Sequence, residues 1–148
     1  MKAPEIISLL PYTVPFLFVD TLEEISENGV RGNYNFAADA FFYKGHFKNY
    51  PVTPGVILTE CCAQIGLVSL GILLINDEVE LRNTKIALVQ STMDFFEPVF
   101  PGEKVTVVSE KVYYRFGKLK CKVSMSNEQG VVVCSGILSG MINKNTNE

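Results

Sequence analysis

The chain has 148 residues, of which 47% are apolar and 20% are charged, and its formal net charge is −3 at pH 7. A chain of this length and apolar content can build one domain with its own core, which excludes an intrinsically disordered protein. The slight acidity gives no electrostatic basis for binding nucleic acid, so we expect none as a partner.

The N-terminal third of the chain predicts one short helix and two strands. Residues 4–10 begin with a proline, which suits the first turn of a helix. Residues 16–25 and 30–36 predict strands, because Glu27-Asn28-Gly29 between them is a turn signal. A further helical turn is expected at residues 37–43, followed by a loop rich in proline and glycine.

An apolar run over residues 56–75 predicts one long helix that ends near Asn76. We expect Thr53 to cap this helix and Pro54 to occupy its first position. The run is long enough to cross a bilayer. However, it contains Glu60 and Gln64, and strand-like segments follow it, so we expect a buried core helix and no membrane span.

The remaining sequence predicts four strands, at residues 85–96, 104–116, 119–127 and 131–142, and a frayed polar tail at residues 143–148. A helix that is apolar on all sides must be buried on all sides. We therefore predict an α+β protein in which an antiparallel sheet of about six strands wraps around one long central helix, as a single domain over residues 1–148. Its apolar sheet faces indicate an oligomer, most simply a dimer.

The cysteines give no sign of a metal site. Cys61, Cys62, Cys121 and Cys134 form no CxxC pair, and the chain has only one histidine, so no zinc ligand set is available. We expect no metal and four buried thiols in a reducing, cytoplasmic compartment. The first residues also lack the pattern of a secretion signal.

Two residues are suited to proton transfer. His46, the only histidine, lies in the loop before the long helix, and imidazole titrates near neutral pH. Glu60 is the only charged residue between Pro51 and Asn76. Burial in the helix would keep its carboxyl group protonated, as a proton donor needs. Taken singly, a histidine is more often structural and a helix glutamate is often ion-paired.

Three neighbours of this pair complete a possible reaction. Gln64, at i+4 from Glu60, can hold the carboxyl group, and the backbone N–H groups of Gly55 and Val56 at the helix N-terminus can bind an oxyanion. A base would remove the proton α to a thioester carbonyl, the N–H groups would hold the enolate-like oxygen, and an acid would protonate a leaving β-hydroxyl. This chemistry needs no cofactor.

The same residues match a known family. Gly45-His46-Phe47, then Pro51-Val52-Thr53-Pro54-Gly55-Val56, then Glu60, Ala63 and Gln64 resemble the 3-hydroxyacyl-acyl carrier protein dehydratases of bacterial fatty-acid synthesis, with the histidine and the glutamate 14 positions apart. The segment from Leu10 to Asp20 resembles that family's LPxxxPFLxVD motif, and the segment from Phe95 to Glu103 resembles its FxxPVxPGD motif. The resemblance extends roughly over residues 9–140.

This resemblance implies the hot-dog fold and dehydration of 3-hydroxyacyl-acyl carrier protein to the trans-2-enoyl product. It implies a homodimer in which His46 of one subunit meets Glu60 of the other; trimers of such dimers are common in the family. It also implies Gly55 as the oxyanion donor and an acyl tunnel lined by Val14, Phe16, Phe47 and Pro54.

The chain departs from the family pattern in three places. Tyr12-Thr13-Val14 replaces His-Arg-Tyr, where the tyrosine is linked to gating of the tunnel. Phe96 and Glu97 stand where a basic residue is expected, and Lys48 replaces a proline. These changes indicate a specialised relative, in secondary lipid or pigment synthesis, that keeps the catalytic pair.

Acyl carrier proteins are acidic, so a docking surface for one should be basic. Lys118, Lys120 and Lys122 alternate along one predicted strand and therefore share a face. Lys44 and Lys48, which flank His46, are rival candidates. A hairpin with one solvated basic face is the alternative interpretation of the first group.

Three other functions remain open from the sequence. A hot-dog thioesterase would use the helix carboxylate to activate water, but it would not need His46 at this spacing. A non-catalytic acyl-binding partner subunit would not need the intact pair. An isomerising relative usually has aspartate at the position of Glu60, which disfavours that activity.

Overall fold

The computed structural model describes residues 1–144. Its helical elements are α1 (Ala3–Leu9), the 3₁₀ turn η1 (Phe41–Lys44), α2 (Gly55–Cys62), the π-helical segment η2 (Ala63–Val68), α3 (Ser69–Ile75) and α4 (Glu78–Arg82). Its strands are β1 (Thr21–Ser26), β2 (Gly29–Asn35), β3 (Thr84–Phe95), β4 (Lys104–Arg115), β5 (Lys118–Ser126) and β6 (Val132–Lys144).

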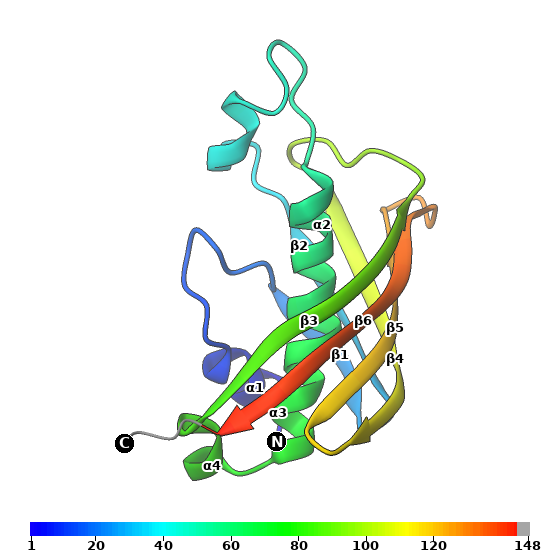
Figure 1. Cartoon of the computed structure of the whole chain (residues 1–148). Coiled ribbons are helices and arrows are strands. Elements are labelled where there is room, and N and C mark those ends of the chain that lie inside the picture. Colours follow the sequence, from blue (N-terminus) through cyan, green and yellow to red (C-terminus); the bar gives the residue numbers. More distant parts are fainter. Residues whose placement is uncertain (145–148) are drawn as a thin grey trace.

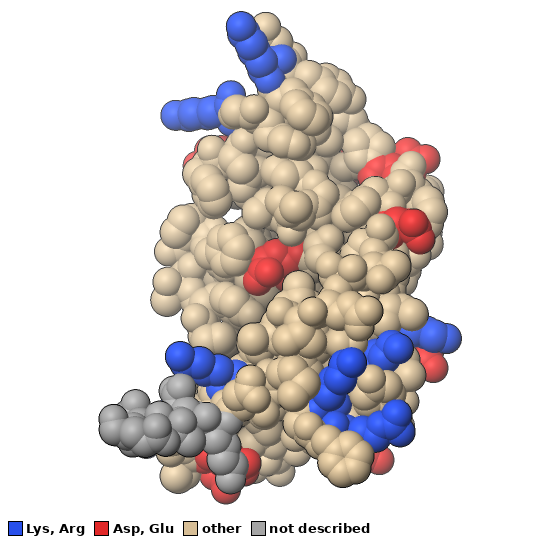
Figure 2. Space-filling model, viewed as in Figure 1, with Lys and Arg blue, Asp and Glu red and all other residues tan. Residues whose placement is uncertain are grey.

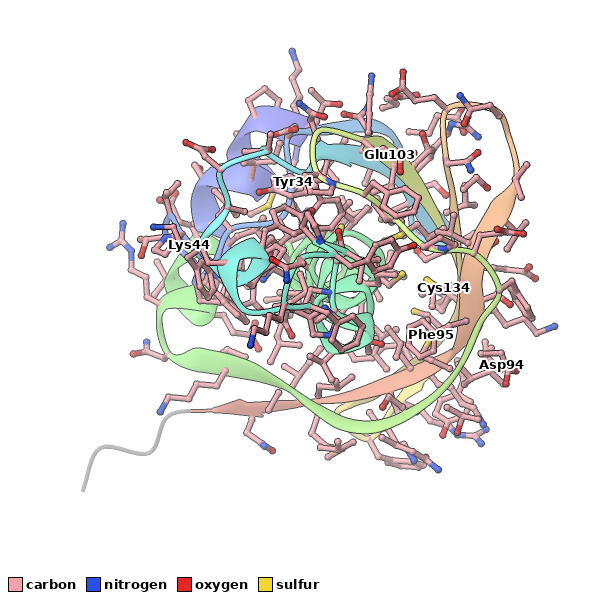
Figure 3. The ribbon with its side chains drawn as sticks, turned by 90° about the horizontal axis from the view of Figure 1, so that it is seen from above. Tyr34, Lys44, Asp94, Phe95, Glu103 and Cys134 are labelled. Carbon is pink, nitrogen blue, oxygen red and sulfur yellow. The ribbon has the colours of Figure 1, made fainter. Side chains whose placement is uncertain are left out.

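The six strands form one antiparallel sheet in the order β1-β2-β4-β5-β6-β3. The sheet curls around a single rod made of α2, η2 and α3, which run on from one another (Figure 1). Viewed along this rod, the strands enclose most of its circumference (Figure 3). The predicted α+β class and wrapped central helix are therefore confirmed.

The rod ends where the sequence predicted, because Asn76 adopts a left-handed conformation (φ 48°) that stops the helix. Its middle is widened into a π-turn at Gln64. The Gln64 carbonyl accepts hydrogen bonds from the Ser69 backbone N–H and, at 2.7 Å, from the Ser69 hydroxyl. A π-turn shifts the helix register, and such turns are frequent at functional sites.

Burial of the rod is complete only over residues 61–72. The prediction of burial on all sides is wrong for the first two turns, where Val56 is 77% exposed and Glu60 is partly exposed. The sheet is open, with β1 and β3 as its two edges, and α1 packs beside α3 but leaves α2 uncovered. The most apolar part of the rod is nevertheless 78% buried inside the protein, as in a core helix.

The predicted strand over residues 16–25 is confirmed only from Thr21 onward. Residues before it bond to a side chain instead of a strand: the Phe18 N–H donates to Gln64 Oε1 at 2.7 Å, and Gln64 Nε2 donates to the Phe16 carbonyl at 3.0 Å. One buried amide thus replaces a ladder and fixes this segment against the central helix.

Two smaller predictions also need correction, and one short helix was not predicted. Thr53 does not cap the helix, because its hydroxyl bonds to the Tyr43 hydroxyl at 2.6 Å; Pro54 is the cap residue and α2 begins at Gly55. The polar segment after Asn76 forms α4, capped by Asp77, whose carboxylate accepts from Val79 and Glu80 N–H groups. Strand β6 extends to Lys144, so the predicted frayed tail starts too early; residues 145–148 lie outside the described part.

All four cysteines are free and buried, as predicted. Burial raises the pKa of the Cys61 thiol well above its usual value, and it raises the pKa of Cys121 to about 12. The Cys62 and Cys134 sulfurs lie 4.0 Å apart, and the pKa of Cys62 is raised because its thiol donates to Cys134 and because it is buried. A thiol that stays protonated is a poor nucleophile, so Cys61, Cys62 and Cys121 act as core side chains, whereas the hydrogen bond from Cys62 lowers the pKa of Cys134.

The central helix contacts the sheet closely through Gly66. A methyl group at this position would lie 2.9 Å from Ser109 Cβ and 3.1 Å from Val123 Cγ1. We expect Gly66→Ala to lower the free energy of unfolding by about 1–3 kcal/mol, although alanine is the better helix former. At Gly71 the methyl group would meet only the flexible Cδ1 end of Ile86 at 2.9 Å, so Gly71→Ala is the matched control with a smaller loss. Urea denaturation of the two variants and wild type measures these free energies of unfolding. A Gly66→Ala protein at least as stable as wild type would contradict close packing between the helix and the sheet at this position.

Candidate active site

The segment between η1 and α2, which contains His46, projects as a loop beyond the N-terminus of α2 (Figure 1). The His46 backbone N–H donates to the carbonyl of Phe42, which belongs to η1, at 3.1 Å. Val52 closes the loop, because its N–H donates to the His46 carbonyl at 2.9 Å. Residues 47–51 thus form a short loop whose two ends are joined by a backbone hydrogen bond. This closure holds the His46 imidazole in one place.

The imidazole makes one hydrogen bond, from Nδ1 to the Val52 carbonyl at 2.8 Å. A carbonyl oxygen can only accept, so Nδ1 must carry the proton. In the neutral ring Nε2 then has the free lone pair. This arrangement fixes the tautomer that a general base requires.

A hollow of about 460 Å³ lies in front of this ring. It is lined by His46, Phe47, Thr53, Gly55, Leu58 and residues 95–98. The Phe95 ring reaches it from the end of β3, and Figure 3 shows this side chain on the inner side of the sheet, with Asp94 directed outward. Only glycine at position 55 leaves room for that ring, because a methyl group there would lie 3.3 Å from it.

The N-terminus of α2 supplies hydrogen-bond donors to the same hollow. The N–H groups of Ile57 and Leu58 both bond to the Pro54 carbonyl. The N–H groups of Gly55 and Val56 have no acceptor among residues 1–144. These are two of the orphan donors at a helix start, where the helix dipole also favours negative charge.

Glu60 is held by Gln64, as the sequence predicted. Gln64 Nε2 donates to Glu60 Oε1 at 3.0 Å, and the same nitrogen donates to the Phe16 carbonyl. Gln64 is fully buried, so its amide is a rigid anchor for a carboxyl group that is itself partly exposed. The predicted deep burial of Glu60 is wrong for a single chain.

His46 and Glu60 are not brought together within one chain. No hydrogen bond or ion pair joins them, and Glu60 does not line the hollow. Leu58 does line it, and two positions apart on a helix differ by about 200° of rotation. Glu60 therefore lies on the opposite side of α2 from the imidazole.

The predicted tunnel residues are divided in the same way. Phe47 lines the hollow with His46, and Pro54 is buried at the start of α2. Phe16 accepts a hydrogen bond from Gln64 on the Glu60 side and Val14 is 82% exposed, and neither lines this hollow. One chain thus carries two half-sites, one around His46 and one around Glu60.

Sequence reasoning missed two neighbours of these half-sites. Tyr12 lies near Glu60, and its pKa is raised to about 12, first by burial and then by the Glu60 carboxylate. Glu97 lines the same hollow as His46 and is the one acid among the residues that line it. Only the departures from the family motif drew attention to these two positions. Within residues 1–144, no group of three or more His, Cys, Asp or Glu side chains could hold a metal ion.

The curled sheet around one central helix, with its site at the N-terminus of that helix, defines a hot-dog protein. Solved structures agree on the fold: a hypothetical thioesterase with coenzyme A from Streptococcus pneumoniae TIGR4 has a TM-score of 0.61 at 15% identity and covers 85% of this chain and 87% of its own. The thioesterase HI1161 from Haemophilus influenzae has a TM-score of 0.63 at 13% identity and covers 86% of this chain and 80% of its own. At such identities the likeness concerns the fold alone.

Sequence comparison gives the family. The FabA-like domain matches residues 10–136. A 3-hydroxyacyl-acyl-carrier-protein dehydratase FabZ from Clostridium perfringens is 34% identical over 140 residues, which cover 92% of this chain and 94% of the relative. A FabZ of the same description from Bacillus licheniformis is 32% identical and covers 93% of each chain. The chain belongs to the FabA-like family, and these two relatives within it are FabZ dehydratases. The predicted resemblance is therefore confirmed.

Proposed function

We propose that this protein is a 3-hydroxyacyl-acyl carrier protein dehydratase that forms the trans-2-enoyl thioester. The observation that carries the proposal is the fixed imidazole of His46, with Nε2 free, over a hollow that is also lined by Gly55, whose N–H group is free. The FabZ relatives supply the substrate class.

Each group has a defined part in this reaction. His46 Nε2 removes the proton α to the thioester carbonyl, while the Gly55 N–H, with Val56 beside it, binds the oxygen that gains negative charge. Glu60, held by Gln64, protonates the departing β-hydroxyl, which leaves as water. The α-proton and the hydroxyl leave from neighbouring carbons, so the base and the acid must each reach one of two adjacent carbons of the same bound substrate.

We further infer that the acid comes from a second copy of the chain, because Glu60 faces away from His46 within one subunit. Strand β3 offers the means of pairing. It is a twelve-residue edge strand whose other edge has no partner within residues 1–144, and Leu88, Val89 and Phe95 on it are exposed. Long apolar edges favour pairing with another chain. A homodimer through β3 would also cover Val56 and the uncovered side of α2.

The acyl carrier protein should dock near the His46 half-site, since its prosthetic arm must reach that hollow. Lys44 ends η1 and lies to one side of the central helix in Figure 3, and Lys48 is in the loop between η1 and α2; both are exposed. Lys118 and Lys120 belong to the other end of the sheet, about 30–35 Å away along the length of β4, and Lys122 pairs with Glu110 near the middle of that strand. We also infer a cytoplasmic location, where acyl carrier proteins act.

Reversing the charge at the docking site should weaken substrate binding. We expect the double variant Lys44→Glu/Lys48→Glu to raise KM for the carrier-bound substrate by about tenfold, because two attractive contacts become repulsive, with little change in kcat. Lys118→Glu/Lys120→Glu is the matched control and should change KM less. Steady-state kinetics at low salt compares them, and the reverse order would move the docking site to the β4–β5 hairpin.

The function itself is tested by product mass. The protein is incubated with 3-hydroxyacyl carrier proteins of several acyl lengths, and the carrier is weighed by mass spectrometry. Loss of one water from the carrier-bound acyl group is the expected result, and the lengths converted report the chain preference. Release of the free acid would indicate a thioesterase instead. An unchanged carrier at every length would favour a non-catalytic subunit.

A further inference from the structure

The tip of the β4–β5 hairpin carries an aromatic side chain with no packing partner. Phe116 is 96% exposed, the highest value among the exposed large hydrophobic residues of the described chain. It occupies a two-residue turn with Gly117, and both have positive φ, 51° and 74°. Such turns favour asparagine, aspartate or glycine, and a bulky residue there is strained. A strained and unburied phenylalanine does nothing for the stability of the fold, which points to a role outside it.

Cations surround the base of this tip. Lys118, Lys120 and Lys122 lie on the outer face of β5, because the residues between them are buried, and Arg115 pairs with Lys118 across the hairpin. None of the four forms an ion pair within residues 1–144. Glu110, opposite Lys122, is the one acid beside them in the strand register. The outer face of this hairpin is therefore strongly positive although the chain as a whole is acidic.

An aromatic ring keeps two of these cations in place. The Arg115 guanidinium lies 4.3 Å from the centre of the Tyr113 ring, and Lys120 Nζ lies 5.8 Å from the same point. Cation–π contacts of this kind restrict long side chains without neutralising them. Figure 2 shows these basic side chains gathered over the β4–β5 end of the molecule, around an uncharged projection.

We propose that this hairpin tip binds the surface of an anionic lipid bilayer. The Phe116 ring inserts between head groups, and the surrounding cations contact lipid phosphates at the depth where the strands begin. An apolar anchor combined with basic residues is the combination that holds peripheral proteins on membranes. It differs from the membrane-spanning helix that the sequence excluded, because only a side chain enters the bilayer.

The shape of the tip favours a lipid surface over a protein partner. A stable protein interface buries about 800 Å² on each side, usually on a flat or concave surface. A two-residue turn that ends in one ring is narrow and convex, and offers little such area. The tip also lies at the opposite end of the sheet from the His46 loop (Figure 1), so a bound membrane leaves the hollow open to a carrier protein.

The chain provides its own reporter design, because it contains no tryptophan. Phe116→Trp places a single fluorophore at the tip. With the full-length protein we expect a blue shift of tryptophan emission on adding phosphatidylglycerol vesicles, and none on adding phosphatidylcholine vesicles. High salt should reverse the shift, since it screens the lysines.

Two substitutions measure the separate contributions by vesicle co-sedimentation. Phe116→Asn suits the turn, so the fold is kept, and it should weaken binding to phosphatidylglycerol about tenfold or more by removing the apolar anchor. Lys120→Gln should weaken it about fivefold. Val131→Asn, at another exposed turn, and Lys85→Gln are matched controls that should bind as wild type does.

Two results would overturn the proposal. One is equal sedimentation of wild type and Phe116→Asn with phosphatidylglycerol vesicles. The other is tryptophan emission of the Phe116→Trp protein that shifts on adding the acidic carrier protein but not on adding vesicles, which would assign the hairpin to protein docking.

Discussion

His46→Ala and Glu60→Gln should each lower kcat for dehydration by about 10²–10⁴-fold, the usual contribution of an acid or base group. Alanine removes the Nε2 lone pair that the Val52 carbonyl keeps available. Glutamine retains the shape of Glu60 and can still meet Gln64, but it cannot supply a proton to the leaving hydroxyl. The measurement is carrier-bound product per minute at saturating substrate.

The control for this pair is Glu97→Gln. Glu97 lines the His46 hollow within the same chain, so it is the acid that a single-subunit mechanism would use. We expect it to retain activity within a few-fold of wild type. All three variants should unfold at similar denaturant concentrations, because none of these side chains is fully buried. If Glu97→Gln were inactive while Glu60→Gln stayed active, the proton donor would be Glu97 and not Glu60.

Gln64→Leu should cost stability as well as activity. Gln64 makes three hydrogen bonds from full burial, to the Phe18 N–H, the Phe16 carbonyl and Glu60. Leucine fills the space but leaves buried backbone groups unpaired, at about 1–3 kcal/mol each. We expect the free energy of unfolding to fall by about 2–5 kcal/mol and kcat to fall with it, as Glu60 loses its anchor.

Two further variants separate these effects. Gln129→Leu is the same change at an exposed turn and should alter stability by less than about 0.5 kcal/mol. Glu60→Gln leaves the two hydrogen bonds from Gln64 to the Phe16–Phe18 segment in place, so it should lose activity while keeping its stability near that of wild type. If Gln64→Leu were as stable as wild type, the amide would not be the link between the Phe16–Phe18 segment and the central helix.

The sequence predicted the fold well wherever one pattern dominated. The long apolar run, interrupted by Glu60 and Gln64 and followed by strands, favoured a core helix, and turn residues marked the ends of the last four strands. The errors arose where a side chain competed with the local pattern. Residues 16–20 have strand composition, yet Gln64 bonds to the Phe16 carbonyl and the Phe18 N–H in place of a neighbouring strand. Thr53 suits a helix cap, yet its hydroxyl bonds to Tyr43. Contacts 10 to 48 residues apart cannot be read from neighbouring residues.

The candidate site shows the same division. Helix spacing predicted the bond from Gln64 to Glu60, because residues four apart share a face. The spacing of His46 and Glu60 gave no distance between them, since a loop and a helix start intervene. Their separation on opposite sides of α2 follows only from the hollow and its lining. The Val52 carbonyl, which fixes the imidazole, is a backbone group and has no sequence signal.

Mixing two inactive variants tests the central claim, a dehydratase site shared between subunits, most directly. His46→Ala and Glu60→Gln chains are unfolded together, refolded as mixed dimers and assayed by loss of water from a 3-hydroxyacyl carrier protein. In each mixed dimer one site keeps both His46 and Glu60, so random mixing should restore about a quarter of wild-type activity. Mixed dimers that form, as mass spectrometry of the intact complex would show, and yet remain inactive would contradict the shared site.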